Sequence, residues 1–199
     1  MFRRLIHTQT SKNIAFAFDI DGVLLRGGNP IDKAGKALRI LNENRIPYVL
    51  LTNGGGTLEY ERTQFISNKL QVQISPLQII QSHTPFKTLS SKFDKILAVG
   101  TPTVRKVAEN YGFKDVVHPN DIVRYNQDIT PFSGLSQEQL SKLTKPIDNL
   151  DTTPFEAVLV FNDPKNWAGD LQIISDLLNS ERGMLNTMRQ SPSSTPSIP

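Results

Sequence analysis

Short apolar runs, separated by segments of helical periodicity, constrain the fold of this chain more than any other feature of its sequence. Residues 14–18 and 47–51 form largely apolar runs of strand length. Between them, from residue 34 to about Asn44, apolar side chains recur at helical spacing, and a second helix is expected to begin near Thr57. Continuous apolar runs are typical of strands covered on both faces in a parallel sheet. This order of elements predicts a right-handed parallel α/β unit, similar to a Rossmann fold.

The same alternation restarts after residue 76 and predicts a second α/β module. The expected elements are a helix over 77–89, a strand over 95–99, a helix over 103–111, a short strand at 116–117, a polar insert of loop and short helix over 133–151, a strand over 157–161 and a helix after Trp167.

The two ends of the chain differ in composition from the rest. Residues 1–12 contain basic and hydroxyl side chains and no acid, a composition typical of a mitochondrial transit segment. Residues 181–199 include a low-complexity stretch rich in Ser and Pro, and we expect this tail to be disordered.

Charge and composition exclude several classes of function. The formal net charge of +3 equals the contribution of Arg3, Arg4 and Lys12, so the remainder is neutral and has no electrostatic footprint for nucleic acid. The chain has no cysteine, which excludes disulfides and Cys-ligated zinc. No apolar run approaches the roughly 20 residues that a transmembrane helix needs. The sequence indicates no oligomeric state.

Two carboxylates follow the first predicted strand, at Asp19 and Asp21. In parallel α/β sheets, ligands bind beyond the carboxyl ends of the strands. The alternation of a strand points both side chains to one side, where they can share a divalent cation or act as nucleophile and acid–base. The alternative is a surface turn, because Asp-Gly is a common turn dipeptide.

Polar residues and glycines also follow the second predicted strand. Thr52 and Asn53 bring a hydroxyl and an amide beside the acidic pair if the two strands are neighbours. The backbone N–H groups of the glycine run that starts at Gly54 can bind an anion at the start of the next helix. We therefore predict a phosphate-binding site at Thr52, Asn53 and Gly54. The alternative is a tight turn with a helix cap at Thr57.

Together these motifs resemble the haloacid dehalogenase (HAD) superfamily, in which a strand followed by Asp-x-Asp-Gly precedes a strand ending in Thr or Ser. The Asp-Gly-Val-Leu-Leu-Arg-Gly and Thr-Asn-Gly-Gly sequences are similar to class IIA phosphatases acting on N-acetylglucosamine phosphate and nitrophenyl phosphate. The segment from Ala157 to Ser180 is similar to the mitochondrial subgroup named after the cat eye syndrome critical region protein.

The resemblance implies a phosphatase of small phosphorylated metabolites. It makes Asp19 the nucleophile that takes the phosphoryl group and Asp21 the acid that protonates the leaving group. It also implies Mg²⁺ at the Asp19 carboxylate and the main-chain carbonyl of Asp21, with Thr52 orienting a phosphoryl oxygen. Residues 13–76 correspond to the amino-terminal part of the HAD core and residues 77–180 to an inserted α/β cap. A link to glycerophospholipid biosynthesis is a further expectation from the subgroup.

The chain departs from the family pattern after Ser180, where neither the later Lys nor the terminal acidic motif of the magnesium site is found. We therefore expect the amino-terminal part of a longer family member, with an incomplete core and weak or no phosphatase activity in isolation. One alternative is a non-catalytic mitochondrial binding or assembly module of HAD ancestry. A receiver-type phospho-acceptor domain fits poorly, since Thr52 stands where a receiver has its acceptor Asp.

Several other polar and aromatic residues are interpreted as structural. The three histidines, His7, His83 and His118, lack ligand spacing and are expected on the surface or in loops. Trp167 is expected in the core, and the segments 92–95 and 59–62 are expected to be solvated helix faces.

Overall fold

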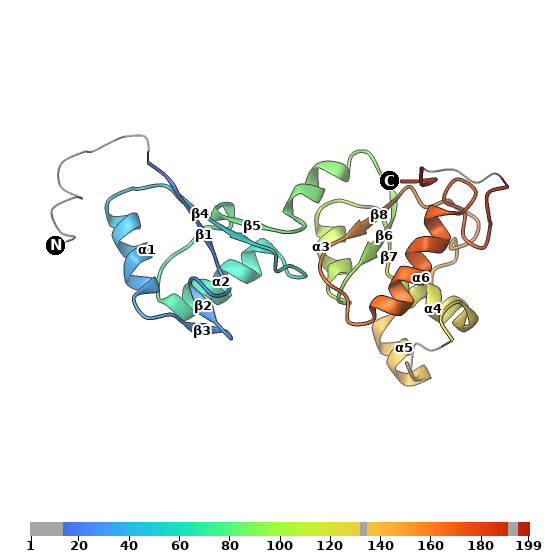
Figure 1. The fold of residues 1–199 in the computed structure, drawn as a ribbon, viewed down its shortest axis with the longest axis horizontal. Coiled ribbons are helices and arrows are strands. Elements are labelled where there is room, and N and C mark those ends of the chain that lie inside the picture. The colour runs from blue at the N-terminus through green and yellow to red at the C-terminus, as the bar shows by residue number, and fades with distance from the viewer. Residues whose placement is uncertain (1–13, 132–134, 191–194) are drawn as a thin grey trace. The chain divides into compact units, whose positions relative to one another are not determined.

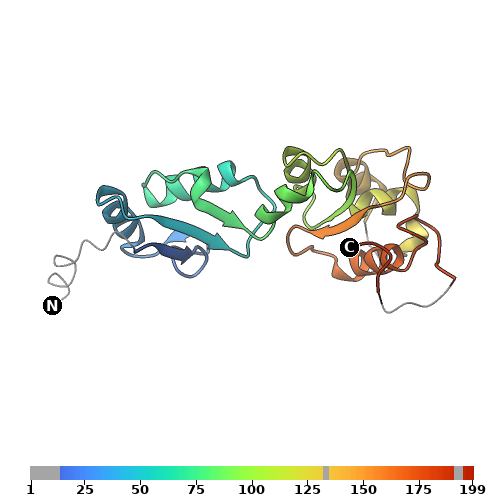
Figure 2. The same ribbon diagram turned by 90° about the horizontal axis from the view of Figure 1, so that it is seen from above.

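The computed structural model describes residues 14–131, 135–190 and 195–199. The predicted transit segment lies outside these residues. The chain divides into two compact units: unit 1 comprises the described residues up to Thr52 together with Glu59–Gln81, and unit 2 comprises Asn53–Leu58 together with the described residues from Ser82 onward. Each unit is an α/β structure built on its own parallel sheet (Figures 1 and 2), so the predicted fold class is confirmed.

Unit 1 contains a three-stranded parallel sheet in the order β1-β4-β5 and a small antiparallel hairpin. Its elements are β1 (Phe16–Asp19), β2 (Leu25–Arg26), β3 (Asn29–Pro30), α1 (Ala34–Glu43), β4 (Tyr48–Thr52), α2 (Glu59–Leu70), the 3-10 turn η2 (Pro76–Gln78) and β5 (Ile79–Gln81). The β2–β3 hairpin turns through Gly27 and Gly28, whose φ angles of 56° and 76° match a two-residue turn that requires positive φ at both positions.

Unit 2 contains a three-stranded parallel sheet in the order β7-β6-β8, with helices on both faces. Its elements are the 3-10 helix η3 (Thr84–Leu89), β6 (Lys95–Val99), α3 (Val104–Asn110), β7 (Asp115–Val117), α4 (Pro119–Tyr125), the 3-10 turn η4 (Gln127–Ile129), α5 (Gln137–Leu143), β8 (Ala157–Val160) and α6 (Trp167–Leu178).

The central strand β6 shows how unit 2 builds two cores. Ile96 and Ala98 point into a cluster that includes Val104 of α3, whereas Leu97 and Val99 point into a cluster formed with α4 and α6. All five residues of β6 are buried. The apolar run over 96–99 predicts this burial for four of them, whereas the burial of Lys95 is not expected from the sequence.

The expected helix over 77–89 is wrong. Ser75 caps only the single 3-10 turn η2 before the chain enters β5, whose buried Ile79 and Gln81 flank the exposed Ile80 in the alternation of a strand. Pro85 then lies in the first turn of η3 and cannot donate a helical hydrogen bond at that position. Because β5 pairs with β4, unit 1 extends to Gln81 and unit 2 resumes at Ser82, five residues later than the boundary after residue 76 expected from the sequence.

Two further expectations differ from the structure. Strand β1 is not covered on both faces, because it lies at the edge of a three-stranded sheet and Phe16 is 41% exposed. In the carboxyl-terminal tail, Leu185 and Ile198 are buried in the core of unit 2, and the N–H of Val158 donates to the carbonyl of Pro199 at 2.8 Å. These apolar contacts hold parts of a segment expected to be disordered, although residues 191–194 lie outside the described range.

Segment 53–58 belongs to unit 2 although both its flanks belong to unit 1. Leu58 is part of the core cluster around α3. A Cβ atom at Gly55 would lie 2.8 Å from the carbonyl oxygen of Phe161 and 2.7 Å from the His83 ring. Such distances leave no room for a side chain, so the glycine permits a close backbone approach.

Candidate functional site

The carboxyl end of β1 carries Asp19, whose side chain is exposed. Its Oδ1 accepts a hydrogen bond from the N–H of Ile20 at 2.7 Å. Ile20 itself is fully buried, and its carbonyl accepts hydrogen bonds from the N–H groups of Leu24 and Leu25 at 2.9 Å. The buried Ile20 thus fixes the backbone just after the nucleophile candidate and leaves the Asp19 carboxylate at the sheet edge.

Asp21 lies in the tight loop that follows β1. The N–H of Gly22 donates to the carbonyl of Leu25 at 2.6 Å, and Gly22 has a φ of 91°, a conformation that favours glycine. Oδ2 of Asp21 lies 3.2 Å from Nη2 of Arg62 on α2. The side chain of Arg62 is only 24% exposed, so the expectation of a solvated face at 59–62 is wrong for this residue, and for Glu59, which is buried.

Thr52 ends β4, the strand directly beside β1. The two strands are parallel, and Asp19 pairs in register with Leu51, so the two strands end within one residue of each other. Thr52 is 8% exposed and pairs in register with Gln81 of β5. The structure therefore brings Asp19, Asp21 and Thr52 to one end of the sheet of unit 1. Asn53 and Gly54 follow Thr52 in the chain but belong to segment 53–58 of unit 2.

The donor set at Asp19 and Asp21 consists of hard oxygen atoms. Mg²⁺ is bound in proteins by one or two carboxylates, with the remaining positions taken by water and by substrate phosphate, so the two residues fit a magnesium ion as partial ligands. No group of three or more His, Asp or Glu side chains that could hold a metal is found within the described parts of the chain. The Asp19 carboxylate and the oxygen atoms of Asp21 are therefore a minimal set that leaves most of the coordination to other donors.

The two described histidines are buried, contrary to the expectation from the sequence. His118 is 2% exposed and is the N-cap of α4: its Nδ1 accepts from the N–H of Asn120 at 3.1 Å, and its Nε2 lies 3.0 Å from the carbonyl of Gly100. Burial lowers the pKa of His118. His83 lies beside Tyr111, with Nδ1 2.7 Å from the phenolic oxygen.

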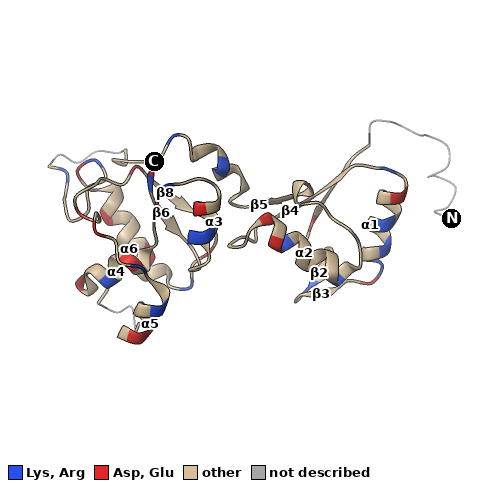
Figure 3. Ribbon diagram, turned by 180° about the vertical axis from the view of Figure 1, so that it is seen from behind, with Lys and Arg blue, Asp and Glu red and all other residues tan. Residues whose placement is uncertain are grey.

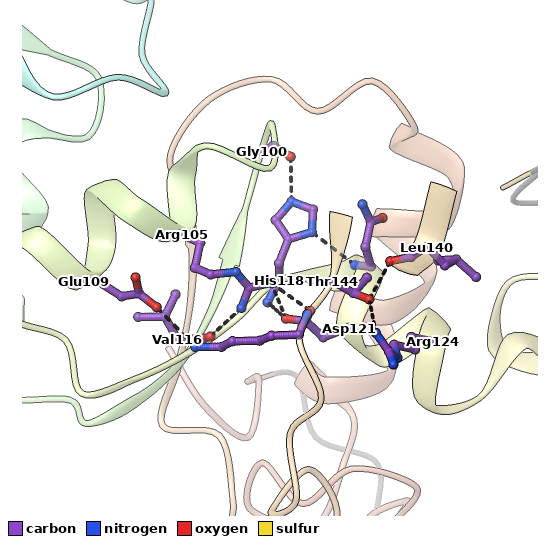
Figure 4. Close-up of polar contacts among 11 residues, drawn as sticks. Gly100, Arg105, Glu109, Val116, His118, Asp121, Arg124, Leu140 and Thr144 are labelled. Atoms are coloured by element: carbon purple, nitrogen blue, oxygen red, sulfur yellow. Dashed lines mark hydrogen bonds and ion pairs between the residues drawn. The ribbon is translucent and has the colours of Figure 1, made fainter. Parts of the chain in front are cut away.

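Polar contacts around His118 centre on Asp121 (Figure 4). The Asp121 carboxylate is fully buried and pairs with Arg105 at 2.6 Å, and it also accepts from the N–H groups of His118 and Lys145 at 2.8 and 3.1 Å. Each charge in this cluster therefore has a partner, and the cluster caps α4 and joins it to α3 and to the loop after α5. We interpret it as structural.

Two other residues interpreted from the sequence lie elsewhere than expected. Trp167 is 41% exposed at the start of α6, so it is not a core residue. Lys95 is 2% exposed in β6, and its Nζ donates to the carbonyls of Asn149 and Thr153 at 2.5 and 2.7 Å. The sequence could not separate Lys95 from its solvated neighbours, because the carbonyls that bind its ammonium group come from a loop more than 50 residues later.

The fold and the acidic strand end define an α/β domain with a carboxylate site at the carboxyl end of its first strand. A family model described as haloacid dehalogenase-like hydrolase matches residues 16–114, which include Asp19, Asp21 and Thr52. The chain belongs to this family of hydrolases.

Individual relatives are consistent with this assignment. The chain is 66% identical over 190 residues to a Saccharomyces cerevisiae protein named mitochondrial hydrolase YKR070W, covering 96% of this chain and 54% of that protein. It is 37% identical over 206 residues to a Schizosaccharomyces pombe protein named as a fusion of cardiolipin synthase (CMP-forming) and mitochondrial hydrolase, covering 99% of this chain and 34% of the fusion. The chain thus spans about half the length of the first relative and a third of the second.

Among solved structures, a hypothetical protein from Pyrococcus horikoshii superimposes with a TM-score of 0.48 at 24% identity, over 65% of this chain and 52% of that one. Within the described residues, no helix combines the length and the apolar character needed to span a bilayer.

Proposed function

We propose that the chain carries the nucleophilic half of a phosphatase site, in which Asp19 attacks a phosphate monoester. The observation that supports this most directly is the exposed Asp19 carboxylate at the end of β1, with Oδ1 held by the Ile20 N–H and with Asp21 two residues further on. The match to the family model spans both residues, and the sequence Asp19-Ile20-Asp21-Gly22 resembles the Asp-x-Asp-Gly motif of the superfamily.

The proposed reaction proceeds in two steps, formation and hydrolysis of an aspartyl-phosphate. An oxygen of Asp19 bonds to phosphorus while the ester P–O bond breaks, and the leaving alkoxide takes a proton from the carboxyl group of Asp21. A water molecule then loses a proton to the Asp21 carboxylate and attacks the phosphorus of the aspartyl-phosphate, which releases inorganic phosphate and regenerates Asp19.

Other residues of the chain are proposed to orient Asp21 and to bind the phosphoryl group. Arg62, 3.2 Å from Asp21, limits the directions in which this carboxyl group can point. Thr52 and the N–H groups of Asn53 and Gly54 are proposed to bind phosphoryl oxygens. A magnesium ion bound by Asp19 and by Asp21 would neutralise charge on the phosphoryl group. The proposal also includes the class IIA assignment, a small phosphorylated metabolite as substrate and a mitochondrial location. The name of the Saccharomyces cerevisiae relative supports the mitochondrial location.

Labelling with radioactive acetyl phosphate in the presence of Mg²⁺ tests the proposal directly. We expect the purified chain to take up label that hydroxylamine removes, as an acyl phosphate requires, and we expect Asp19→Asn to abolish the label. Because no group of three or more His, Asp or Glu side chains that could hold a metal occurs among the described residues, we expect little or no steady-state release of phosphate by the chain alone. Equal labelling of the Asp19→Asn variant would disprove the role of Asp19.

A second candidate function is a non-catalytic assembly module with a vestigial acidic pair. The exposed apolar side chains Leu51 and Ile80 on the sheet of unit 1 favour this candidate. A connection with glycerophospholipid metabolism belongs here too, prompted by the name of the Schizosaccharomyces pombe fusion protein. Calorimetric titration with Mg²⁺ separates the two functions: the same affinity before and after Asp19→Asn favours the non-catalytic module.

A further inference from the structure

Asn162 joins the two loops at the carboxyl end of the sheet of unit 2. Val99 of β6 pairs in register with Val160 of β8, and Thr101 and Asn162 each follow two residues later in the chain. Oδ1 of Asn162 accepts a hydrogen bond from the N–H of Thr101 at 2.9 Å, and Nδ2 of Asn162 donates to Oγ1 of Thr101 at 3.2 Å. Because both ends of the carboxamide are bonded to one residue, its orientation is fixed.

Segment 53–58 lies directly against this carboxamide. A Cβ atom at Gly56 would lie 2.7 Å from Nδ2 of Asn162 and 2.9 Å from Oγ1 of Thr101. These distances are shorter than van der Waals contact, so only a glycine lets the backbone approach the two side chains so closely. Gly56 also has a φ of 88°, a conformation that favours glycine. The contact of Gly56 with Asn162 therefore sets where the segment lies on unit 2.

The two halves of segment 53–58 have different environments. Gly56 and Leu58 are buried, whereas Asn53 and Gly54 are exposed. The later half is thus held in unit 2, and the earlier half is the part that a ligand can reach. No residue of the segment carries a charge (Figure 3). An anion bound there would be held by backbone N–H groups, so its affinity would depend on the directions in which these groups point.

We propose that Asn162 is a positioning residue of the phosphate site. Its carboxamide, fixed by Thr101, holds Gly56 and thereby the backbone of Asn53 and Gly54, whose N–H groups bind phosphoryl oxygens. An asparagine suits this position because it offers an acceptor to the N–H and a donor to the hydroxyl of Thr101 without adding a charge near the anion. The proposal rests on the proposed function, since it assigns Asn162 to the same phosphate site.

Amide exchange, measured by NMR on the isotope-labelled chain with inorganic phosphate as the probe, tests the positioning without chemistry at Asp19. We expect phosphate to slow the exchange of the Asn53 and Gly54 amides in the parent chain. In Asn162→Ala we expect faster exchange along segment 53–58 and about three- to tenfold weaker phosphate binding, because the contact that holds the segment is lost. Unchanged exchange in the variant, or no response of Asn53 and Gly54 to phosphate in the parent chain, overturns the proposal.

The kinetics of labelling distinguish positioning from a general loss of structure. We expect the half-saturating concentration of acetyl phosphate to rise in Asn162→Ala, with a maximal rate of labelling at Asp19 within about twofold of the parent rate. Asn166→Ala is the matched control, because it removes a hydrogen bond from the same loop to the N–H of Gly169, at the start of α6 and not in segment 53–58. Equal effects of the two variants contradict the positioning role.

Thr101 allows a conservative test of the same contact. Thr101→Val keeps the shape of the side chain and removes the acceptor of the Asn162 Nδ2, whereas Thr101→Ser keeps the hydroxyl. Circular dichroism verifies that all variants fold. We expect Thr101→Val to weaken phosphate binding as Asn162→Ala does and Thr101→Ser to bind phosphate as the parent chain does. If Thr101→Ser binds phosphate as weakly as Thr101→Val, the hydroxyl does not hold the carboxamide and the proposal fails.

The two readouts separate this proposal from the proposed function. Protection of Asn53 and Gly54 by phosphate that depends on Asn162, without label at Asp19, supports the positioning role and refutes the phosphatase. Labelling of Asp19 whose half-saturating concentration is the same in Asn162→Ala as in the parent chain refutes the positioning role and supports the nucleophile.

Discussion

Nη2 of Arg62 lies 3.2 Å from Oδ2 of Asp21, and this contact joins α2 to the loop after β1. The Asp21 side chain is 61% exposed, so the contact is open to solvent and contributes less than about 1 kcal/mol to stability. The contact instead affects cation binding at the acidic pair and the orientation of Asp21. A guanidinium beside one of two carboxylates repels a cation that approaches them, and it holds Asp21 in one orientation.

Replacing Arg62 by Met is expected to tighten Mg²⁺ binding two- to tenfold at low ionic strength, because a competing positive charge is removed from the acidic pair. Isothermal titration with MgCl₂ measures the affinity. Lys69→Met is the matched control, since it removes a positive charge two turns further along α2. If both variants bind Mg²⁺ equally well, the effect is one of net charge and not of the Arg62–Asp21 contact.

Replacing Lys95 by Met is expected to destabilise unit 2 by about 2–4 kcal/mol, because the carbonyls of Asn149 and Thr153 lose the ammonium donor of the buried Lys95. Urea unfolding followed by the fluorescence of Trp167, the single tryptophan of the chain, measures the change. Lys92→Met changes an exposed lysine three residues away and is expected to have no effect. A loss below about 0.5 kcal/mol for Lys95→Met would show that water replaces the ammonium group.

Replacing Asp170 by Asn is expected to stabilise unit 2 at neutral pH. Burial raises the pKa of Asp170 to about 6, from 3.8. The folded state therefore holds this proton more tightly than the unfolded state, and the stability present below pH 3.8 is lost as the pH rises through 6. The raised pKa sets an upper limit of about 3 kcal/mol on this effect, and solvent screening of the carboxylate reduces it.

We accordingly expect Asp170→Asn to gain about 1–2 kcal/mol at pH 7.5 and nothing at pH 4. Denaturant unfolding at both pH values tests this, with the exposed Asp176→Asn on the same helix as control. A gain of equal size at pH 4 and pH 7.5 would exclude the ionisation of Asp170 as its cause.

His118 is expected to make unit 2 less stable in acid. Burial lowers its pKa, so below the ordinary value of about 6.5 the unfolded state binds more protons than the folded state. Stability that is present at pH 7 is therefore lost as the pH falls toward 5. Protonation at Nδ1 also removes the acceptor of the Asn120 N–H. We expect His118→Gln to have a flatter profile between pH 7 and 5 in thermal unfolding, and a slope as steep as that of the parent chain would show that other groups titrate.

Much of this fold could be predicted, because most of its strands are apolar runs that can be recognised from neighbouring residues in the sequence. Strand β6 occupies the expected residues 95–99, β4 is shifted by one residue from the expected 47–51, and β8 ends one residue earlier than expected. Strand β5 could not be recognised, because three residues are too few to establish an alternation and their partner β4 lies about 30 residues earlier. The burial of His118 likewise could not be recognised, because the carbonyl of Gly100 beside its Nε2 lies 18 residues earlier in the sequence.

The candidate site was predictable where it depends on the end of one strand. Asp19 and Thr52 follow from strand ends that the apolar runs mark. Arg62 was missed because its contact with Asp21 spans 41 residues and no local pattern distinguishes it from a solvated arginine. The exposure of Leu51 and Ile80 on the sheet of unit 1 was missed for the same reason, since exposure depends on which strands are neighbours and on which side the helices cross.

Segment 53–58 limits how this protein can be dissected. The chain passes between the two units three times, after Thr52, after Leu58 and after Gln81. A recombinant fragment that starts at Ser82 would lack the hexapeptide, leaving a hole in its core where Leu58 packs and an uncovered surface at Phe161. A chimaera that exchanges unit 2 between relatives must therefore carry the donor's own hexapeptide, spliced in separately between β4 and α2.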